Sequence, residues 1–218
     1  MSDEPIELIV KPDILVPDTL PLIHLSQAGA LGLLHDIGGT VVIVDMVYYE
    51  LTRDLDKPEA RVLADWIAEG VKPGSNRPIR LEKTEVGRVF SIAQKTDPKV
   101  RMKDGGEIAI VQWLVESVDA TDHRTIVIYE NGKVPSFIAN RNLDIDIDVL
   151  TTHAFLELAE RGHLVPSADN VWNKIIASAP GANPALESFS RRRLPTPNRE
   201  SEDPAQGANY GKPSSSRN

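Results

Sequence analysis

The sequence contains no cysteine, few aromatic residues and no long apolar run. The absence of cysteine excludes disulfides, zinc–thiolate sites, iron–sulfur clusters and cysteine nucleophiles. No window reaches the ~18 consecutive apolar residues of a membrane helix. The acidic start of the chain also lacks the basic end and apolar stretch of a signal peptide. We therefore expect a cytoplasmic protein with no membrane partner.

The charge of the chain is unevenly distributed along its 218 residues, and its net value is −8. The segment from Ser188 onward carries six basic and three acidic side chains, a charge of +3, so the residues before it carry −11. A body this acidic repels polyanions through its general field. A nucleic-acid partner would therefore need a local basic patch or bound cations.

The hydrophobic pattern alternates between short β-branched runs and segments of helical periodicity. It predicts strands over residues 14–16, 40–44, 79–81, 125–129 and 145–150. It predicts two short helices within 20–34 and further helices over 46–52, 58–69, 86–94, 107–118, 151–161 and 167–178. This alternation favours the α/β class with a mostly parallel central sheet.

The composition changes near Pro180. Residues 1–180 are expected to form one domain, whereas 181–218 are rich in Pro, Ser, Asn, Gly and Arg and poor in aliphatic residues. Such a segment buries too little apolar surface to offset its ordering entropy, so we expect a disordered, flexible tail. Asp144, Asp146 and Asp148 are expected to form the solvated face of an edge strand.

Several catalytic motifs are missing from the sequence. It has no GxxxxGK[ST] loop, no GxGxxG after a strand, no GxSxG elbow and no HExxH. Its five histidines show no i, i+4 pair, so each is interpreted as a surface or half-buried residue: His24, His35, His123, His153 and His163. Trp113 and Trp172 are interpreted as core residues.

Four carboxylates stand where the predicted sheet would gather a ligand. Asp18 directly follows the first strand and Glu130 the fourth, and the carboxyl ends of parallel strands face one crevice. Glu50 lies one to two helical turns past the second strand, and Glu107 opens the helix before the fourth. Carboxylates at one rim repel one another unless a divalent cation neutralises them, and oxygen ligands favour Mg²⁺ or Mn²⁺. Such a site suits phosphodiester hydrolysis.

Each acid also has a purely structural interpretation. Asp18 is suited to a helix N-cap, and Glu107 in a first helical turn complements the helix dipole. Glu50 could be a solvated residue of an amphipathic helix, and Glu130 could belong to a turn with Asn131-Gly132. The case for a site therefore depends on their convergence.

Four segments resemble, in order and spacing, the acidic motifs of PIN domains. They are DTLPLIHLSQAG at 18–29, VDMVYYELT at 44–52, GEIAI at 106–110 and IVIYEN at 126–131. The segment from Thr151 to Pro166 is similar to the helix and glycine that close one PIN subgroup. The resemblance covers about residues 14–178.

The resemblance implies a three-layer α/β/α nuclease that hydrolyses RNA as the VapC-like toxin of a toxin–antitoxin pair. It implies that Asp18, Glu50, Glu107 and Glu130 hold one or two Mg²⁺ or Mn²⁺ ions, with Asp104 as an alternative to Glu107. Thr19 would support Asp18. The expected partners are an RNA substrate, a cognate antitoxin and a second copy of the chain.

Other interpretations remain open. Arg53, Lys99, Arg101, Lys103 and Lys133 could contact phosphates or could belong to a mixed-charge surface. Leu20 and Glu130 differ from the residues usual in the family. A second hypothesis is therefore a module with weak or no catalysis that binds RNA or a protein. A third hypothesis is a nuclease that cleaves DNA. Arg191, Arg192 and Arg193 could fold back onto the acidic rim, or the tail could act as a solubilising or RNA-tethering segment.

Overall fold

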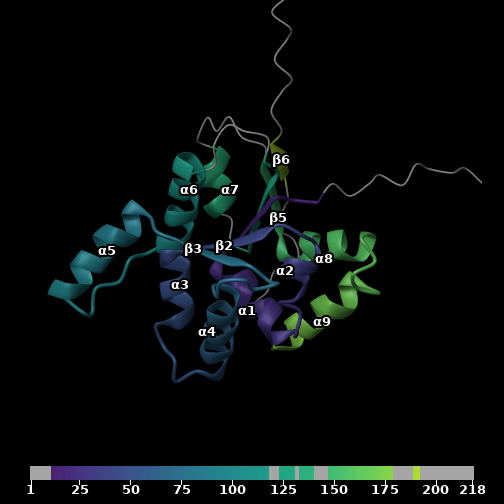
Figure 1. The fold of residues 1–218 in the computed structure, drawn as a ribbon, viewed down its shortest axis with the longest axis horizontal. Helices are drawn as coiled ribbons and strands as arrows, with labels where there is room; N and C mark the ends of the chain where they lie inside the picture. Colours follow the sequence, from purple (N-terminus) through teal and green to yellow (C-terminus); the bar gives the residue numbers. More distant parts are fainter. Residues whose placement is uncertain (1–10, 118–122, 131–132, 140–146, 179–188, 192–218) are drawn as a thin grey trace, which may run out of the picture.

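A computed structural model describes residues 11–117, 123–130, 133–139, 147–178 and 189–191 of the chain. Figure 1 shows the arrangement of its elements. In chain order they are β1 (Ile14–Pro17), α1 (Thr19–Gln27), α2 (Leu33–Asp36), β2 (Thr40–Val44), α3 (Asp45–Thr52), α4 (Pro58–Gly70), β3 (Ile79–Glu82), α5 (Glu85–Thr96), α6 (Gly105–Ser117), β4 (Thr125–Tyr129), α7 (Lys133–Ala139), β5 (Ile147–Thr151), α8 (Thr152–Arg161), α9 (Ala168–Ser178) and β6 (Phe189–Arg191).

The sheet has the strand order β3-β2-β1-β4-β5-β6. The first five strands are parallel, and β6 runs antiparallel to β5. Ile14 of β1 is paired with Thr40 on one side and with Thr125 on the other. The order of strands thus reverses on either side of β1, which is where open α/β sheets form a ligand crevice beyond the carboxyl ends of the strands.

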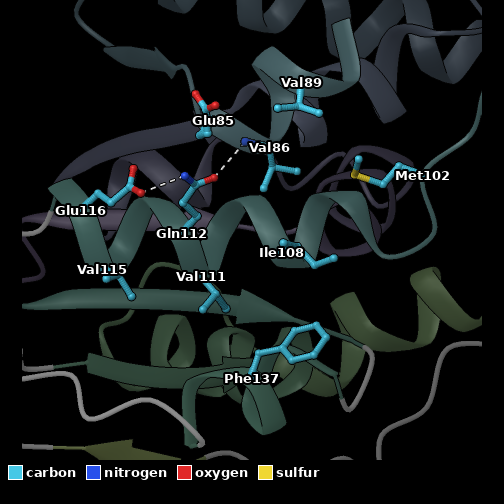
Figure 2. Close-up of a pocket in the computed structure, with 10 residues that line it drawn as sticks. All are labelled: Glu85, Val86, Val89, Met102, Ile108, Val111, Gln112, Val115, Glu116 and Phe137. Carbon is cyan, nitrogen blue, oxygen red and sulfur yellow. Dashed lines mark hydrogen bonds between the residues drawn. The ribbon is translucent and has the colours of Figure 1, made fainter. Parts of the chain in front are cut away.

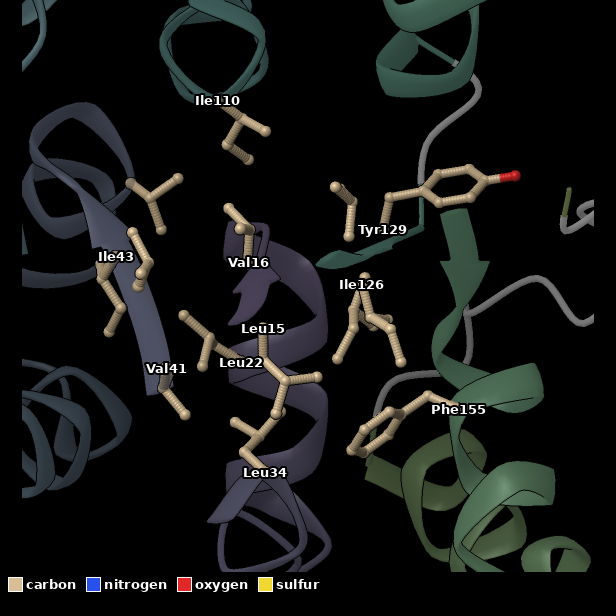
Figure 3. Close-up of a cluster of buried hydrophobic side chains, with 14 of the residues drawn as sticks. Leu15, Val16, Leu22, Leu34, Val41, Ile43, Ile110, Ile126, Tyr129 and Phe155 are labelled. Atoms are coloured by element: carbon tan, nitrogen blue, oxygen red, sulfur yellow. The ribbon is translucent and has the colours of Figure 1, made fainter. Parts of the chain in front are cut away.

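Helices cover both faces of the sheet (Figure 1), which confirms the expected α/β class and mostly parallel sheet, and gives the three layers that the resemblance implied. In Figure 3, Ile110 of α6 lies on one side of the buried strands, and Leu22, Leu34 and Phe155 lie on the other. These three side chains come from α1, α2 and α8. The strands β2 and β4 are nearly continuous in β-branched residues because both of their faces are buried.

The C-terminal half of the sheet differs from the prediction in two elements. The short helix α7 was not predicted. Strand β6 lies inside the segment predicted to be disordered, although Phe189 pairs with Val149 of β5. The rest of that segment, apart from β6, lies outside the described residues.

The prediction for Asp148 was wrong, because β6 makes β5 an interior strand. Asp148 is buried, and its carboxylate accepts hydrogen bonds from the Arg124 guanidinium at 2.8 and 2.9 Å. A buried charge requires such a partner. Asp144 and Asp146, predicted to share its solvated face, lie outside the described residues.

The backbone position of Arg191 can be compared with the hypothesis that Arg191, Arg192 and Arg193 fold back onto the acidic rim. Arg191 is paired with Ile147, the first residue of β5, and so lies at the amino end of the parallel strands. The carboxyl ends, where the acids stand, are at the opposite edge. Arg192 and Arg193 lie outside the described residues.

None of the described helices combines the length and the apolar character that crossing a membrane requires. Trp113 and Trp172 are buried in the core as expected. Ser167 accepts a hydrogen bond from the Asn170 backbone N–H at 3.2 Å and so caps the start of α9.

Candidate active site

A cleft of about 640 Å³ opens beyond the carboxyl end of β1, and acidic residues line it. They include Asp18, Glu50 and Glu107, three of the four predicted site residues, and Asp104. Asp18 follows β1, Glu50 lies on α3 and Glu107 lies in the first turn of α6. Because α3 packs against both α1 and α6, these three side chains meet in one cleft.

Asp18 is the most deeply buried acid of the cleft, with 2% of its surface exposed. Its backbone N–H donates to the Ile128 carbonyl at 2.8 Å, which ties the end of β1 to β4. Asp18 occupies the N-cap position of α1, but its side chain makes no capping hydrogen bond. Helix capping therefore does not account for its carboxylate.

The environment of Asp18 favours the neutral acid. The pKa of Asp18 is raised to about 7: burial is the largest cause, the carboxylates of Glu107, Glu50 and Glu130 add to the rise, and the Thr19 backbone N–H offsets part of it. The proton is thus held more tightly than in an ordinary aspartic acid. A bound cation would favour the ionised form.

Glu50 is held in place by two donors from distant segments. The Thr19 hydroxyl donates to Glu50 Oε2 at 2.6 Å, and the Gly106 backbone N–H donates to Oε1 at 3.2 Å. The resemblance implied that Thr19 supports Asp18, but in the structure the hydroxyl of Thr19 donates its hydrogen bond to Glu50. Glu50 is therefore half-buried and hydrogen-bonded to two other segments, which the interpretation as a solvated helix residue did not include.

Gly106 is a site residue that the sequence did not reveal. A Cβ atom at this position would lie 3.1 Å from Glu50 Oε2 and 3.4 Å from Asp18 Oδ1. The glycine therefore leaves the space in which these two carboxylates approach the start of α6. Its position just before Glu107 was the signal that could have identified it.

Asp104 and Glu107, the two alternatives for the third ligand, differ in their surroundings. Asp104 has a left-handed backbone with φ of 58° and forms an ion pair with Lys133 of α7. The hydrogen bond to Asp104 raises the pKa of Lys133, and the charge of Glu107 adds to the rise. Glu107 is buried beside the cleft. Asp104 is thus paired with the ammonium group of Lys133.

Glu130, the fourth predicted acid, stands apart from the other three. It follows β4, its side chain is only 3% exposed, and it does not line the cleft. Its Oε1 lies 2.7 Å from Nδ1 of His24 on α1, although the two atoms are not aligned as a hydrogen bond. His24 is buried, so its interpretation as a surface or half-buried residue was wrong.

Positive charge near the cleft comes from a few exposed side chains. Arg53 and Lys57 line the cleft wall, and the Lys57 ammonium lies 3.2 Å from the Asp54 carboxylate. Lys99, Arg101 and Lys103 are exposed on the segment that leads to Asp104, and Lys57 was not among the predicted phosphate contacts. The cleft is therefore acidic at its floor and mixed in charge at its rim.

The cleft has the donor chemistry of a hard-cation site, but it is not closed around one position. In the part of the chain that the structure describes, no three His, Asp or Glu side chains are close enough to enclose a metal ion. The donors that line the cleft are carboxylate oxygens, which suit Mg²⁺ or Mn²⁺. Buried Asp18 fits the same conclusion, because a bound cation would offset the repulsion from the carboxylates that help to raise its pKa.

A second hollow, here called the apolar groove, lies between α5, α6 and α7 and measures about 670 Å³. Figure 2 shows aliphatic side chains along it, with Glu85 and Glu116 at one end. Its lining residues are Glu85, Val86, Val89, Met102, Ile108, Val111, Gln112, Val115, Glu116 and Phe137. It contains none of the predicted site residues.

The chain belongs to the PIN domain family, because a family model described as a PIN domain matches residues 14–133. The match spans β1 to the start of α7 and includes all four predicted acids. PIN domains are generally nucleases and typically use divalent metal ions. No curated protein and no solved structure matches the chain.

Proposed function

We propose that the protein is a Mg²⁺- or Mn²⁺-dependent endoribonuclease that hydrolyses RNA phosphodiesters. The observation that carries the proposal is the Asp18 carboxylate, buried in the acidic cleft with a pKa raised to about 7 by its surroundings. A buried carboxyl group that has a strongly shifted pKa and lies near other carboxylates is typical of a functional site. Membership of a family of nucleases gives the reaction class.

In this proposal, Asp18, Glu50 and Glu107 hold the cation. When bound, a divalent ion supplies an acidified water and a positive charge for the phosphate. Thr19 and Gly106 fix the Glu50 carboxylate through their hydrogen bonds, so it needs little reorganisation to act as a ligand. Arg53 and Lys57 on the cleft wall are suited to bind the flanking phosphates of the substrate.

A toxin role with a cognate antitoxin, and pairing with a second copy of the chain, are finer parts of the same proposal. They rest on the resemblance of the four acidic motifs to PIN domains, which often act as VapC-type toxins. Induced expression of the wild type should then arrest growth, and that of Asp18→Asn should not. Equal growth of both strains at equal protein levels would contradict the toxin role.

A second candidate function is a PIN module that binds RNA or protein with little catalysis. It is favoured by two observations on the described residues: no three acids enclose a cation, and Asp104 is paired with Lys133. Such a module would bind RNA in EDTA as well as in Mn²⁺.

The test is cleavage of a mixed RNA pool by the purified protein in Mg²⁺, Mn²⁺ or EDTA, beside Asp18→Asn. We expect cleavage that depends on the metal and falls at least about 100-fold in the variant, since a ligand needed for the transition state is lost. Asp148→Asn is the matched control, because it alters a buried acid outside the cleft. Inert wild-type protein that binds RNA equally in EDTA would favour the binding module.

A further inference from the structure

The four predicted acids divide into three that reach the cleft and one that does not. Glu130 lies close enough to Asp18 for its charge to act on it, yet its side chain is almost fully covered and lines no part of the cleft. A cation in the cleft would therefore meet Asp18, Glu50 and Glu107 before it met Glu130.

His24 is the group that Glu130 faces instead. It lies on the side of α1 that packs toward the core, among Pro21, Leu22 and Leu25. Nδ1 of His24 and Oε1 of Glu130 are 2.7 Å apart, and neither atom has an aligned hydrogen-bond partner among the described residues. Each thus has the other as a polar neighbour within hydrogen-bond distance.

Moving Glu130 toward the cleft would separate this pair. It would take from a buried imidazole nitrogen the carboxylate that lies 2.7 Å from it, and an unsatisfied buried polar group is costly. Packing of α1 over β4 keeps His24 where it is, since both elements belong to the buried core. The contact with His24 therefore favours a Glu130 carboxylate that stays outside the lining of the cleft.

We propose that His24 is a positioning residue that keeps the Glu130 carboxylate out of the cation's ligand set. The cation site of this chain then consists of Asp18, Glu50 and Glu107, and Glu130 acts only through its neighbours. The inference rests on the proposed metal-dependent function, and it changes which residues perform that function.

The first test is calorimetric titration of the full chain with Mn²⁺ alone. Asp18→Asn should weaken Mn²⁺ binding at least about tenfold, because a charged ligand is lost. Glu130→Gln, which keeps the shape of the side chain, should change the affinity by less than about threefold, the range expected for a site that is not a ligand. Equal losses in the two variants would overturn the inference.

The second test asks whether His24 acts through Glu130. His24→Leu removes the polar neighbour and frees the carboxylate to join the ligands, so Mn²⁺ affinity should rise by about threefold or more. The rise should disappear in the Glu130→Gln background, and His24→Asn, which restores a polar group, should return the affinity to the wild-type value. A loss of affinity that is the same with and without Glu130 would contradict the positioning role.

The outcomes separate this inference from the proposed function. Tight Mn²⁺ binding that needs Asp18 but not Glu130, without RNA cleavage, would support the ligand set and remove the nuclease. Cleavage and Mn²⁺ binding that both need Glu130 would support the nuclease and overturn the ligand set. Absence of Mn²⁺ binding by the wild type would overturn both. If His24→Leu does not fold, the comparison of Glu130→Gln with Asp18→Asn still decides.

Discussion

The acidic cleft and the apolar groove are of similar size, and α6 contributes to both, but their side chains are constrained very differently. Glu107 of α6 lies in the cleft, and Ile108, Val111 and Val115 of the same helix line the groove. In the cleft, two hydrogen-bond donors fix Glu50, and the charges of three other carboxylates raise the pKa of Asp18. In the groove, several aliphatic side chains are about half exposed. Buried carboxylates that repel one another and are held by hydrogen bonds are typical of a reaction site. The half-exposed aliphatic side chains of the groove are held by few such contacts.

The largest expected effect is the dependence of stability on pH that comes from Asp18. Its pKa is raised from 3.8 to about 7 in the folded protein, so the folded state binds the proton more tightly than the unfolded state. Stability without metal should therefore be greatest below pH 4 as far as this group is concerned, fall as pH rises toward 7, and then level off. The upper limit of the fall is about 4 kcal/mol, at 1.36 kcal/mol per pKa unit.

Urea unfolding in EDTA at several pH values measures this effect. Asp18→Asn should lose the fall between pH 4 and 7 and be more stable than the wild type at pH 8. Asp148→Asn is the control, since it should instead be destabilised by loss of the charge that pairs with the part-buried Arg124 guanidinium. An unchanged pH profile in Asp18→Asn would mean that burial of this carboxylate has no energetic cost.

Gly106→Ala should give the next largest effect. The added methyl group would lie 3.1 Å from Glu50 Oε2, so the Glu50 carboxylate must shift by a few tenths of an ångström, and it would touch Asp18 Oδ1 at 3.4 Å. We expect a loss of Mn²⁺ affinity of about tenfold, the scale of disturbed support for metal ligands. Gly32→Ala is the matched control because its nearest contact would be at 3.7 Å. Equal Mn²⁺ affinities of the two variants would show that the space at Gly106 is not required.

Thr19→Val should have a smaller effect on the cleft. It keeps the shape of the side chain and removes the 2.6 Å hydrogen bond to Glu50. A net loss of about 1 kcal/mol corresponds to a fall of about fivefold in Mn²⁺ affinity and RNA cleavage. Thr52→Val, which removes only a hydrogen bond to the Tyr48 carbonyl, should leave both unchanged. A fall of the same size in both variants would count against a special role for Thr19.

Val89→Ser in the apolar groove should have the smallest effect. Val89 is 50% exposed, so its replacement should alter the free energy of unfolding by less than about 0.5 kcal/mol. RNA cleavage should stay at the wild-type rate, measured beside Thr19→Val. A marked loss of cleavage in Val89→Ser would mean that the groove and the cleft are not independent.

The fold was largely predictable because its signals are local. The β-branched runs of β2 and β4 and the helical periodicity between them predict a parallel sheet without knowledge of distant contacts. Asp18 and Glu130 could be placed at the carboxyl ends of β1 and β4 for the same reason. Glu50 could be expected near Asp18 because its helix starts at the carboxyl end of β2. Glu107 could be expected there because it opens the helix that leads to β4.

The parts that were missed depend on contacts between distant segments. His24 looks like an ordinary helix residue until β4 brings Glu130 beside it, although its place among buried Pro21, Leu22 and Leu25 was a usable signal. Asp148 was assigned to an edge strand because Phe189–Arg191, which pairs with β5, lies in a segment whose composition is typical of disorder. Gly106 matters because of side chains from two other elements.

The strand order also determines when the site can exist during synthesis of the chain. β1 has β2 and β4 as neighbours, but β4 is made only after β2, β3 and the six helices from α1 to α6. Until then one edge of β1 stays unpaired, which exposes it to wrong partners. A growing chain that ends before α6 contains Asp18 and Glu50 but lacks Glu107. On the proposed function, the enzyme therefore becomes able to cut RNA only after the chain has been made as far as β4.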